Sequence, residues 1–258
     1  MQSLRGVTVC LPACNEAATV GRIVRTIGRE LVDKGIVDEI LVVDDGSTDG
    51  TADASRAAGA RVVTADGSEP GRAAGKGAAM RTGLAASRGD VVVYCDADVR
   101  NFAAHFVTRL LEPLSDPRVV FVKAYYDRPL HDDPHGGGRV TELVAKPLIS
   151  LLFPHLREIR QPLAGECAGR REALEDLDFA SGYAVDLALV IDLAERYGVS
   201  AIAQADLGVR VHRNRTLDQL SDQSRSIIAM VLERAGIELH DLGRPIGPAF
   251  RDRTVLPG

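Results

Sequence analysis

The chain has 258 residues, of which 45% are hydrophobic and 26% charged, and its formal net charge is −5. This length and composition indicate a globular protein with one large domain or two small ones, and the acidic balance argues against a general nucleic-acid binder, which usually shows a basic excess. The apolar runs are too short to span a bilayer, the N-terminus lacks a signal-peptide pattern and the four cysteines show no Cys-x-x-Cys spacing, so we expect a cytoplasmic protein without membrane insertion and with reduced thiols.

The first half of the chain alternates strand-like and helix-like patterns. Short apolar runs predict strands at residues 7–13, 39–45, 60–65, 90–96 and 119–126. Apolar residues at helical spacing and segments closed by glycine predict helices at residues 16–31, 76–89 and 102–114, with a loop leading into a helix at 48–59. Strands separated by helices imply right-handed crossovers and a mostly parallel sheet.

The second half of the chain is less regular. Helical patterns occupy residues 139–153, 184–198 and 217–236, and strand-like residues occupy 200–213. The segment after residue 236 is rich in proline and glycine, which is typical of a loose tail. We find no internal repeat and no clear linker, so the simplest organisation is one α/β domain with an elaborated C-terminal part.

Polar residues follow three of the predicted strands at the point where each strand ends. In open parallel sheets, ligands bind at the carboxyl ends of the strands, so these side chains are expected to meet at one edge. The residues in question are Asn15, Glu16, Asp44, Asp45, Ser47, Asp96 and Asp98.

The Asp96/Asp98 pair is informative only through its position. With 23 aspartates in 258 residues, chance supplies about two Asp-x-Asp pairs, and two are present. The pair Asp176/Asp178 follows no apolar strand and is expected to be a solvated turn after a short helix. Asp96 and Asp98, in contrast, end a buried strand, where two carboxylates are well placed to hold Mg²⁺ or Mn²⁺. The alternative, that Asp98 only caps the next helix, stays open at this point.

A glycine run precedes the predicted helix at 139–153. In "HGGGRVTE", residues 135–142, free backbone amides and a helix N-terminus face any anion, and Arg139 and Thr141 add a guanidinium and a hydroxyl group. A flexible loop that uses glycine only for its turns is the alternative. Further along, "VRVHRNR" places His212 among basic residues, although a lone histidine on a strand is more often structural.

The motifs in this order resemble the GT-A nucleotide-sugar glycosyltransferases. The segments "LPACNEAATV", "VVDDGSTDGT", "GKGAAMRTGLAASRGD" and "DAD" carry this likeness over residues 7–98. Downstream, "GGGRVTELVAKPL", "QPLAGECAGRREAL", "GYAVDLALVIDLAERYG" and "QADLGVRVHRNRTLDQL" are similar to the glucosyl-3-phosphoglycerate synthase family and its mannosyl relatives. The resemblance implies an α/β GT-A fold, Rossmann-like, with a mostly parallel sheet flanked by helices. It divides the chain into a nucleotide-sugar-binding half (1–125), an acceptor-binding and metal-completing part of the same domain (126–236) and a tail (237–258).

The resemblance also implies roles for individual residues. Lys76, Asp98 and Asp186 are expected to be catalytic, and Asp98 and His212 to hold Mg²⁺ or Mn²⁺. The donor would be bound by Pro12, Ala13, Asn15, Glu16, Asp45, Ser47, Gly75, Lys76, Asp96, Ala97 and Asp186. The acceptor would be bound by Gly138, Arg139, Thr141, Arg210 and Asn214.

The implied activity is metal-dependent, retaining transfer of a hexose, with UDP-glucose as the expected donor, to a small phosphorylated acceptor such as 3-phosphoglycerate. A homodimer is also implied. Two departures put the sugar and the acceptor in question: Asp186 stands where the family has glutamate, and Ala97 where it has serine. The alternatives are an inverting GT-A transferase that uses a polyprenyl-phosphate or other acceptor, and a relative with a specialised-metabolite acceptor. For a double displacement, Glu166 and Asp186 are the nearest candidate nucleophiles.

Overall fold

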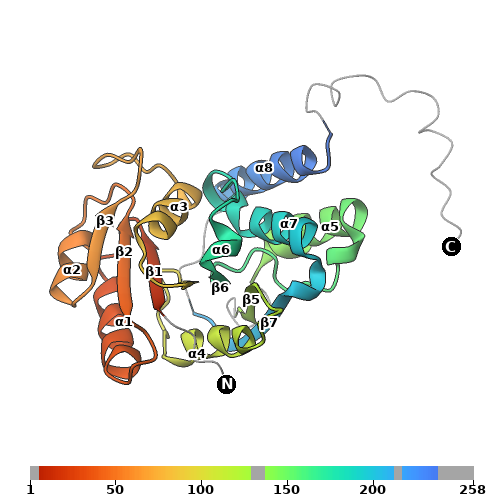
Figure 1. The fold of residues 1–258 in the computed structure, drawn as a ribbon. Helices are drawn as coiled ribbons and strands as arrows, with labels where there is room; N and C mark the ends of the chain where they lie inside the picture. The colour runs from red at the N-terminus through yellow and green to blue at the C-terminus, as the bar shows by residue number, and fades with distance from the viewer. Residues whose placement is uncertain (1–5, 129–136, 212–216, 238–258) are drawn as a thin grey trace, which may run out of the picture.

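Seven strands form one sheet in the computed structural model, which describes residues 6–128, 137–211 and 217–237. The order across the sheet is β3-β2-β1-β4-β6-β5-β7 (Figure 1). All neighbours pair in parallel except β6, which is antiparallel to both β4 and β5. The strands are β1 Val7–Ala13, β2 Glu39–Asp44, β3 Arg61–Thr64, β4 Val91–Tyr94, β5 Phe121–Asp127, β6 Cys167–Arg170 and β7 Ile202–Val209.

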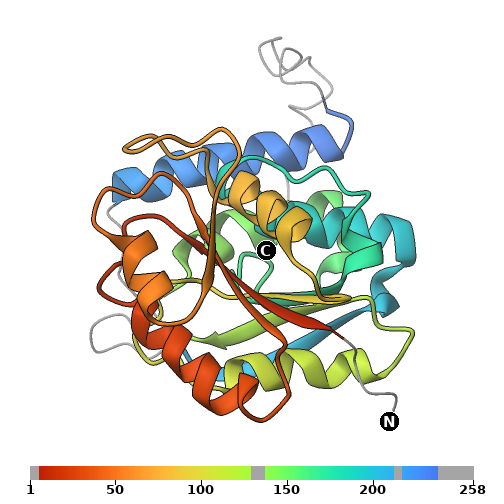
Figure 2. The ribbon, with the colours of Figure 1, turned by 60° about the vertical axis from the view of Figure 1, so that its left-hand side comes forward.

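Helices cover both faces of this sheet (Figures 1 and 2). On one face lie α1 Val20–Ile27, α2 Thr51–Ala57 and α4 His105–Leu111. On the other lie α3 Lys76–Ala86, α5 Lys146–Leu152, α6 Arg171–Leu174, α7 Val185–Tyr197 and α8 Leu217–Arg234. Short helical turns adjoin them: η1 Gly28–Val32, η2 Glu112–Ser115, η3 Thr141–Ala145, η4 Pro154–Leu156, η5 Gly182–Ala184 and η6 Val199–Ala201.

The two helical layers explain why the strands read as unbroken apolar runs. Successive side chains of a strand point to opposite faces, and along β1 Val9 and Leu11 enter the core under α1 and α4, whereas Cys10 enters the core under α3 and α7. Both faces are therefore dry, which is the usual situation of a parallel sheet.

The predicted elements are present with small shifts, and one strand was missed. The helix predicted from residue 16 begins at Val20. The residues before it form a turn, in which the Glu16 amide donates to Thr51 at the start of α2 and the Ala17 amide to Asp49 in the loop after β2. The missed strand is β6, whose four residues carry neither alternation nor a β-branched run. The mostly parallel α/β prediction is confirmed, and the sheet crosses the expected division at residue 125, which falls inside β5.

The direction of each strand determines which residues meet. Since β6 runs against its neighbours, its first residue Cys167 pairs with Tyr94 at the end of β4. The segments before β6 and after β4 therefore lie at the same edge of the sheet, together with the segments that follow β1, β2, β5 and β7.

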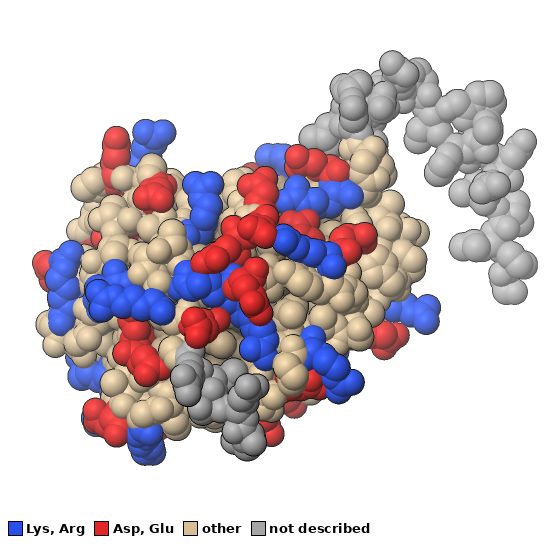
Figure 3. Space-filling model, viewed as in Figure 1, with Lys and Arg blue, Asp and Glu red and all other residues tan. Residues whose placement is uncertain are grey.

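The outer surface shows mixed charge. On the face seen in Figure 3, Lys and Arg side chains lie among Asp and Glu side chains rather than in one broad basic area. Among the described residues, none of the helices has the length and apolar character needed to cross a membrane.

Candidate active site

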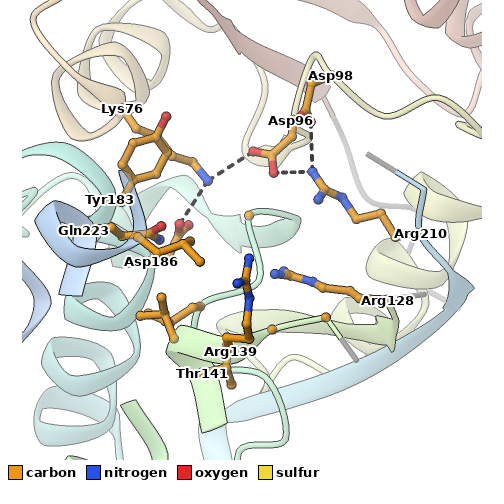
Figure 4. Close-up of a pocket in the computed structure, with 16 residues that line it drawn as sticks. Lys76, Asp96, Asp98, Arg128, Arg139, Thr141, Tyr183, Asp186, Arg210 and Gln223 are labelled. Carbon is orange, nitrogen blue, oxygen red and sulfur yellow. Dashed lines mark hydrogen bonds and ion pairs between the residues drawn. The ribbon is translucent and has the colours of Figure 1, made fainter. Parts of the chain in front are cut away.

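An open cleft of about 800 Å³ lies at this edge of the sheet (Figure 4). A second hollow, of about 580 Å³, adjoins it and is lined by the loop after β1. Four residues line both spaces and so form the boundary between them: Lys76, Asp96, Asp98 and Tyr183. The second hollow alone holds Pro12, Ala13, Cys14, Glu16, Asp45, Ala79 and Ala97, and the first alone holds Gly137, Gly138, Arg139, Thr141, Asp186 and Arg210, among others.

The loops after β1 and β2 are tied to each other. Asn15 has a φ of 57°, and its side-chain oxygen accepts a hydrogen bond from the Thr48 amide at 2.9 Å, while its own amide donates to the Ser47 hydroxyl at 2.9 Å. Asparagine is among the residues that tolerate this left-handed conformation. The buried Asp45 carboxylate accepts from the Ala74 and Gly75 amides at 2.6 and 2.9 Å, so it fixes the loop from which α3 and Lys76 begin.

Lys76 is an ammonium held between two carboxylates. Its Nζ lies 3.0 Å from Asp186 Oδ2 and 3.1 Å from Asp96 Oδ1. Burial by itself would lower the pKa of Lys76, but the charges of Asp186 and Asp96 outweigh it and raise that pKa above its ordinary value. Lys76 is therefore a permanent cation at the boundary of the two hollows.

A second cation, Arg210, is held by three carboxylates. Its Nε lies 2.7 Å from Glu166 Oε1, and its Nη2 lies 2.6 Å from Asp96 Oδ2 and 3.0 Å from Asp98 Oδ1. The Arg210 side chain is 3% exposed and that of Glu166 is 1% exposed, whereas Asp98 is 27% exposed. Burial would raise the pKa of Asp96, but Lys76 and Arg210 hold it well below its usual range.

The Asp96 carboxylate has a glycine behind it because no larger residue fits there. A Cβ atom added to Gly165 would lie 2.2 Å from Asp96 Oδ2 and 2.4 Å from Oδ1. The turn before β6 therefore packs directly against the Asp96 carboxylate.

The donor set at Asp96 and Asp98 suits a hard divalent cation, which prefers carboxylate oxygens. Both carboxylates line both hollows, and each is about a quarter exposed. Within residues 6–128, 137–211 and 217–237, no group of three or more His, Cys, Asp or Glu residues is placed to hold a metal. A metal held by Asp96 and Asp98 would therefore need further ligands from outside this set.

Asp186 lies in the first turn of α7 and is held from two sides. Lys123 of β5 is fully buried and donates from Nζ to the Asp186 backbone oxygen at 2.8 Å, and the same Nζ lies 3.8 Å from Asp186 Oδ1. Oδ1 has no hydrogen-bond donor among the described residues. The carboxylate is thus oriented by Lys76 at Oδ2 and by Lys123 at Oδ1.

The far wall of the cleft is the glycine run. Gly138 has a φ of 77°, and the chain continues through η3 and α5 as one helical segment from Thr141 to Leu152. Arg139 and the buried Thr141 line the cleft here (Figure 4).

The structure brings most of the predicted site residues together; a few lie outside the described part of the chain or do not line the two hollows. Two predicted residues, His212 and Asn214, lie outside the described residues. Ser47 and Asn15 do not line either hollow but bond to each other beside it. The Asp176/Asp178 pair lies on the surface, as predicted, with Asp176 paired to Arg196 at 2.7 Å.

Several residues that line or support the cleft were not predicted from the sequence. The missed residues are Lys123, Tyr126, Arg128, Gly165, Tyr183 and Gln223, and Glu166 entered only as a candidate nucleophile. Applying the strand-end rule to the fifth strand would have found Arg128, which directly follows β5.

Comparison with known proteins identifies a matching family and relatives of this chain. Residues 8–178 match glycosyl transferase family 2. The chain is 46% identical over 246 residues to glucosyl-3-phosphoglycerate synthase of Mycolicibacterium smegmatis, a match that covers 93% of this chain and 80% of that protein. It is 42% identical over 236 residues to the protein of the same name from Petrotoga mobilis, covering 88% and 73%.

Solved structures of such proteins share the fold. The crystal structure of glucosyl-3-phosphoglycerate synthase from Mycobacterium tuberculosis with Mn²⁺, UDP-glucose and phosphoglyceric acid matches with a TM-score of 0.82 and 46% identity, covering 91% of this chain and 81% of that one. A structure of that protein with Mg²⁺ and UDP matches with a TM-score of 0.81 and 45% identity, covering 91% and 80%.

Proposed function

Because this chain belongs to glycosyl transferase family 2, we propose that it is a metal-dependent retaining glycosyltransferase that moves glucose from UDP-glucose to 3-phosphoglycerate. The observation that carries the proposal is the pair of adjoining hollows that share Lys76, Asp96 and Asp98. One hollow suits a nucleotide sugar and the other an anionic acceptor, and the shared residues lie where the two substrates would react.

The donor would lie along the loops after β1, β2 and β4. Pro12, Ala13, Glu16 and Ala97 line this hollow, and Asn15, Ser47 and Asp45 fix the loops around it. Gly75 has a φ of 100°, which favours glycine, and it lets the chain turn into α3 so that Lys76 faces the cleft.

Asp98, with His212, would hold Mg²⁺ or Mn²⁺. Bound there, the metal supplies a positive charge that stabilises negative charge on the leaving diphosphate. The related structures with Mn²⁺ and UDP-glucose, or with Mg²⁺ and UDP, support this assignment. Asp96 is paired with two cations, so we assign it to positioning Lys76 and Arg210.

The acceptor phosphate would bind at the glycine run. Gly138 offers a backbone amide, Arg139 a guanidinium and Thr141 a hydroxyl, at the start of a helical segment whose N-terminus favours anions. Arg210 and Asn214 remain predicted acceptor contacts, although the nitrogens of Arg210 already bond to Glu166, Asp96 and Asp98.

The carboxylates of the cleft favour front-face substitution over a double displacement. Glu166 is buried between Arg210 and the Tyr126 hydroxyl and does not line the cleft. Asp186 lines the cleft but is paired with Lys76. In front-face substitution the acceptor hydroxyl attacks as the diphosphate departs from the same face, and a phosphate oxygen takes up the hydroxyl proton. Lys76 then stabilises charge on the leaving group, and the walls of the cleft position the acceptor.

Asp186 would bind hydroxyl groups of the transferred sugar. A carboxylate here is one methylene shorter than the glutamate of the family, which withdraws it by about 1.5 Å. This shift is enough to change which sugar hydroxyl the carboxylate reaches, and a panel of donors tests the identity of the sugar.

A cytoplasmic homodimer is part of the proposal. Leu143, Leu151 and Leu217 are more than 70% exposed, on η3, α5 and α8, and a second copy would cover such side chains. Sedimentation velocity measures this directly, and a monomer at micromolar concentration would contradict it.

The test of the proposed function is a donor panel. The protein is incubated with 3-phosphoglycerate, Mn²⁺ and each of UDP-glucose, GDP-mannose and UDP-N-acetylglucosamine, and the release of nucleoside diphosphate is measured. We expect UDP-glucose to give the highest kcat/KM. Nucleoside diphosphate release that is unaffected by omitting 3-phosphoglycerate would contradict the acceptor assignment.

A further inference from the structure

Arg128 is a cation that reaches the cleft from the end of β5, directly beside the glycine run. It directly follows β5 and lines the large cleft as well as a smaller hollow formed with Tyr126, Gly138 and Thr141. In Figure 4 the guanidinium groups of Arg128 and Arg139 extend into the same part of the cleft from different elements.

Buried contacts hold the Arg128 side chain in place. Its Nη2 donates to the Tyr126 hydroxyl at 2.7 Å, and that hydroxyl donates to Glu166 Oε2 at 2.7 Å. The guanidinium carbon lies 4.8 Å from the centre of the Tyr126 ring, and the Gly137 amide donates to the Arg128 backbone oxygen at 2.9 Å. A side chain at Gly137 would collide with Arg128, since its Cβ would lie 2.4 Å from the Arg128 Cβ. The arginine is therefore ordered before any ligand arrives.

One donor of this ordered cation is unused. The Nε atom of Arg128 is buried and has no hydrogen-bond partner among the described residues. Buried charged donors are normally satisfied, because leaving one without an acceptor is unfavourable. The Arg128 side chain also lines the cleft, so an anionic group of a bound ligand is a suitable acceptor for this guanidinium.

We propose that Arg128 binds the carboxylate of the acceptor while Gly138, Arg139 and Thr141 bind its phosphate. The assignment rests on the proposed function, because it presumes an acceptor with two anionic groups. The two guanidinium groups come from adjacent segments, the end of β5 and the glycine run, and two neighbouring cations suit a short molecule with two anionic groups. A guanidinium matches the planar geometry of a carboxylate, and an acceptor that lacks the carboxylate leaves Nε without a partner.

The inference predicts a preference between two acceptors of similar size. 3-Phosphoglycerate carries both groups, and glycerol 3-phosphate carries the phosphate alone. Dissociation constants for both are measured by calorimetry with UDP and Mn²⁺ present. The wild type should bind 3-phosphoglycerate at least about 10-fold more tightly, and in Arg128→Gln this ratio should fall to about one, chiefly through weaker binding of 3-phosphoglycerate.

Two control variants separate this role from general damage. Arg139→Gln should weaken both ligands by similar factors and leave their ratio unchanged, because it acts on the phosphate. Arg160→Gln, which removes a guanidinium stacked on Tyr125 on the same strand, should alter neither constant. If Arg128→Gln does not fold, Arg128→Lys keeps the charge without the planar fork and should still lower the ratio, by about 3-fold or more.

An unchanged ratio in a folded Arg128 variant, or wild-type protein that binds neither ligand, would overturn the assignment. Binding with the expected ratio but without sugar transfer would overturn the proposed function instead, so the two failures are distinguishable.

Discussion

Replacing Arg210 by methionine should destabilise the fold strongly, because it leaves a buried carboxylate without its ion-pair partner. Glu166 is 1% exposed, and without Arg210 its remaining side-chain partner among the described residues is the Tyr126 hydroxyl. Asp96 and Asp98 are about a quarter exposed, and Asp96 retains Lys76, so water screens their loss. The cost is therefore set mainly by Glu166.

Breaking a buried pair by removing one partner costs about 3–5 kcal/mol. For a chain of this size each kcal/mol corresponds to about 2–4 °C in Tm, so Arg210→Met should lower Tm by about 6–20 °C. Urea unfolding followed by circular dichroism gives the free energy of unfolding, and differential scanning fluorimetry gives Tm.

Adding Glu166→Gln to Arg210→Met removes the unpaired buried charge of the Glu166 carboxylate. The double variant should therefore recover at least about half of the lost stability. The control is Arg118→Met, because Arg118 forms an exposed pair with Asp116 at 2.7 Å and should change stability by less than about 0.5 kcal/mol. The reasoning is refuted if Arg210→Met costs less than about 1 kcal/mol, or if the second substitution restores nothing.

Asp98→Ala should lower the transfer rate by on the order of 10²-fold or more while Tm stays within a few degrees; near-wild-type UDP release would show that Asp98 holds no metal. Gly165→Ala should also lower the transfer rate, since its Cβ would lie 2.2 Å from Asp96, whereas Gly28→Ala, which meets no atom within 4 Å, should not; equal rates for the two variants would contradict the packing argument. Because the pKa of Asp96 is lowered in the folded state, its contribution to stability is complete above pH ~3.9 and is lost as pH falls through the folded pKa. The urea midpoint of Asp96→Asn should therefore fall less steeply than that of the wild type below pH 4, and parallel curves would speak against this linkage.

The parts of the site that local sequence predicts are those at the ends of regular strands. Asp96 and Asp98 follow an apolar run that is typical of a buried strand, and the strand-end rule places them correctly. Lys76 begins a helix after a glycine, which is again a local pattern. In each case the apolar run before the polar residues determines where the polar residues lie.

The buried network around Arg210 depends on contacts that no local pattern reveals. Glu166 meets Arg210 only because β6 is inserted antiparallel between β4 and β5, and the "CAGR" of that strand has no period of its own. The paired residues are 44 positions apart. Topology, rather than local propensity, brings these charges together. Strand and helix patterns in the sequence therefore do not predict which charged residues pair.

The central claim is transfer of glucose with retention of configuration, and product analysis by NMR tests it most directly. The protein is incubated with UDP-glucose, 3-phosphoglycerate and Mn²⁺, and the anomeric proton of the new glucoside is recorded as UDP accumulates. The account predicts an α-linked glucosyl phosphoglycerate formed in step with UDP. A β-linked product, or UDP and free glucose without a glucoside, would contradict it.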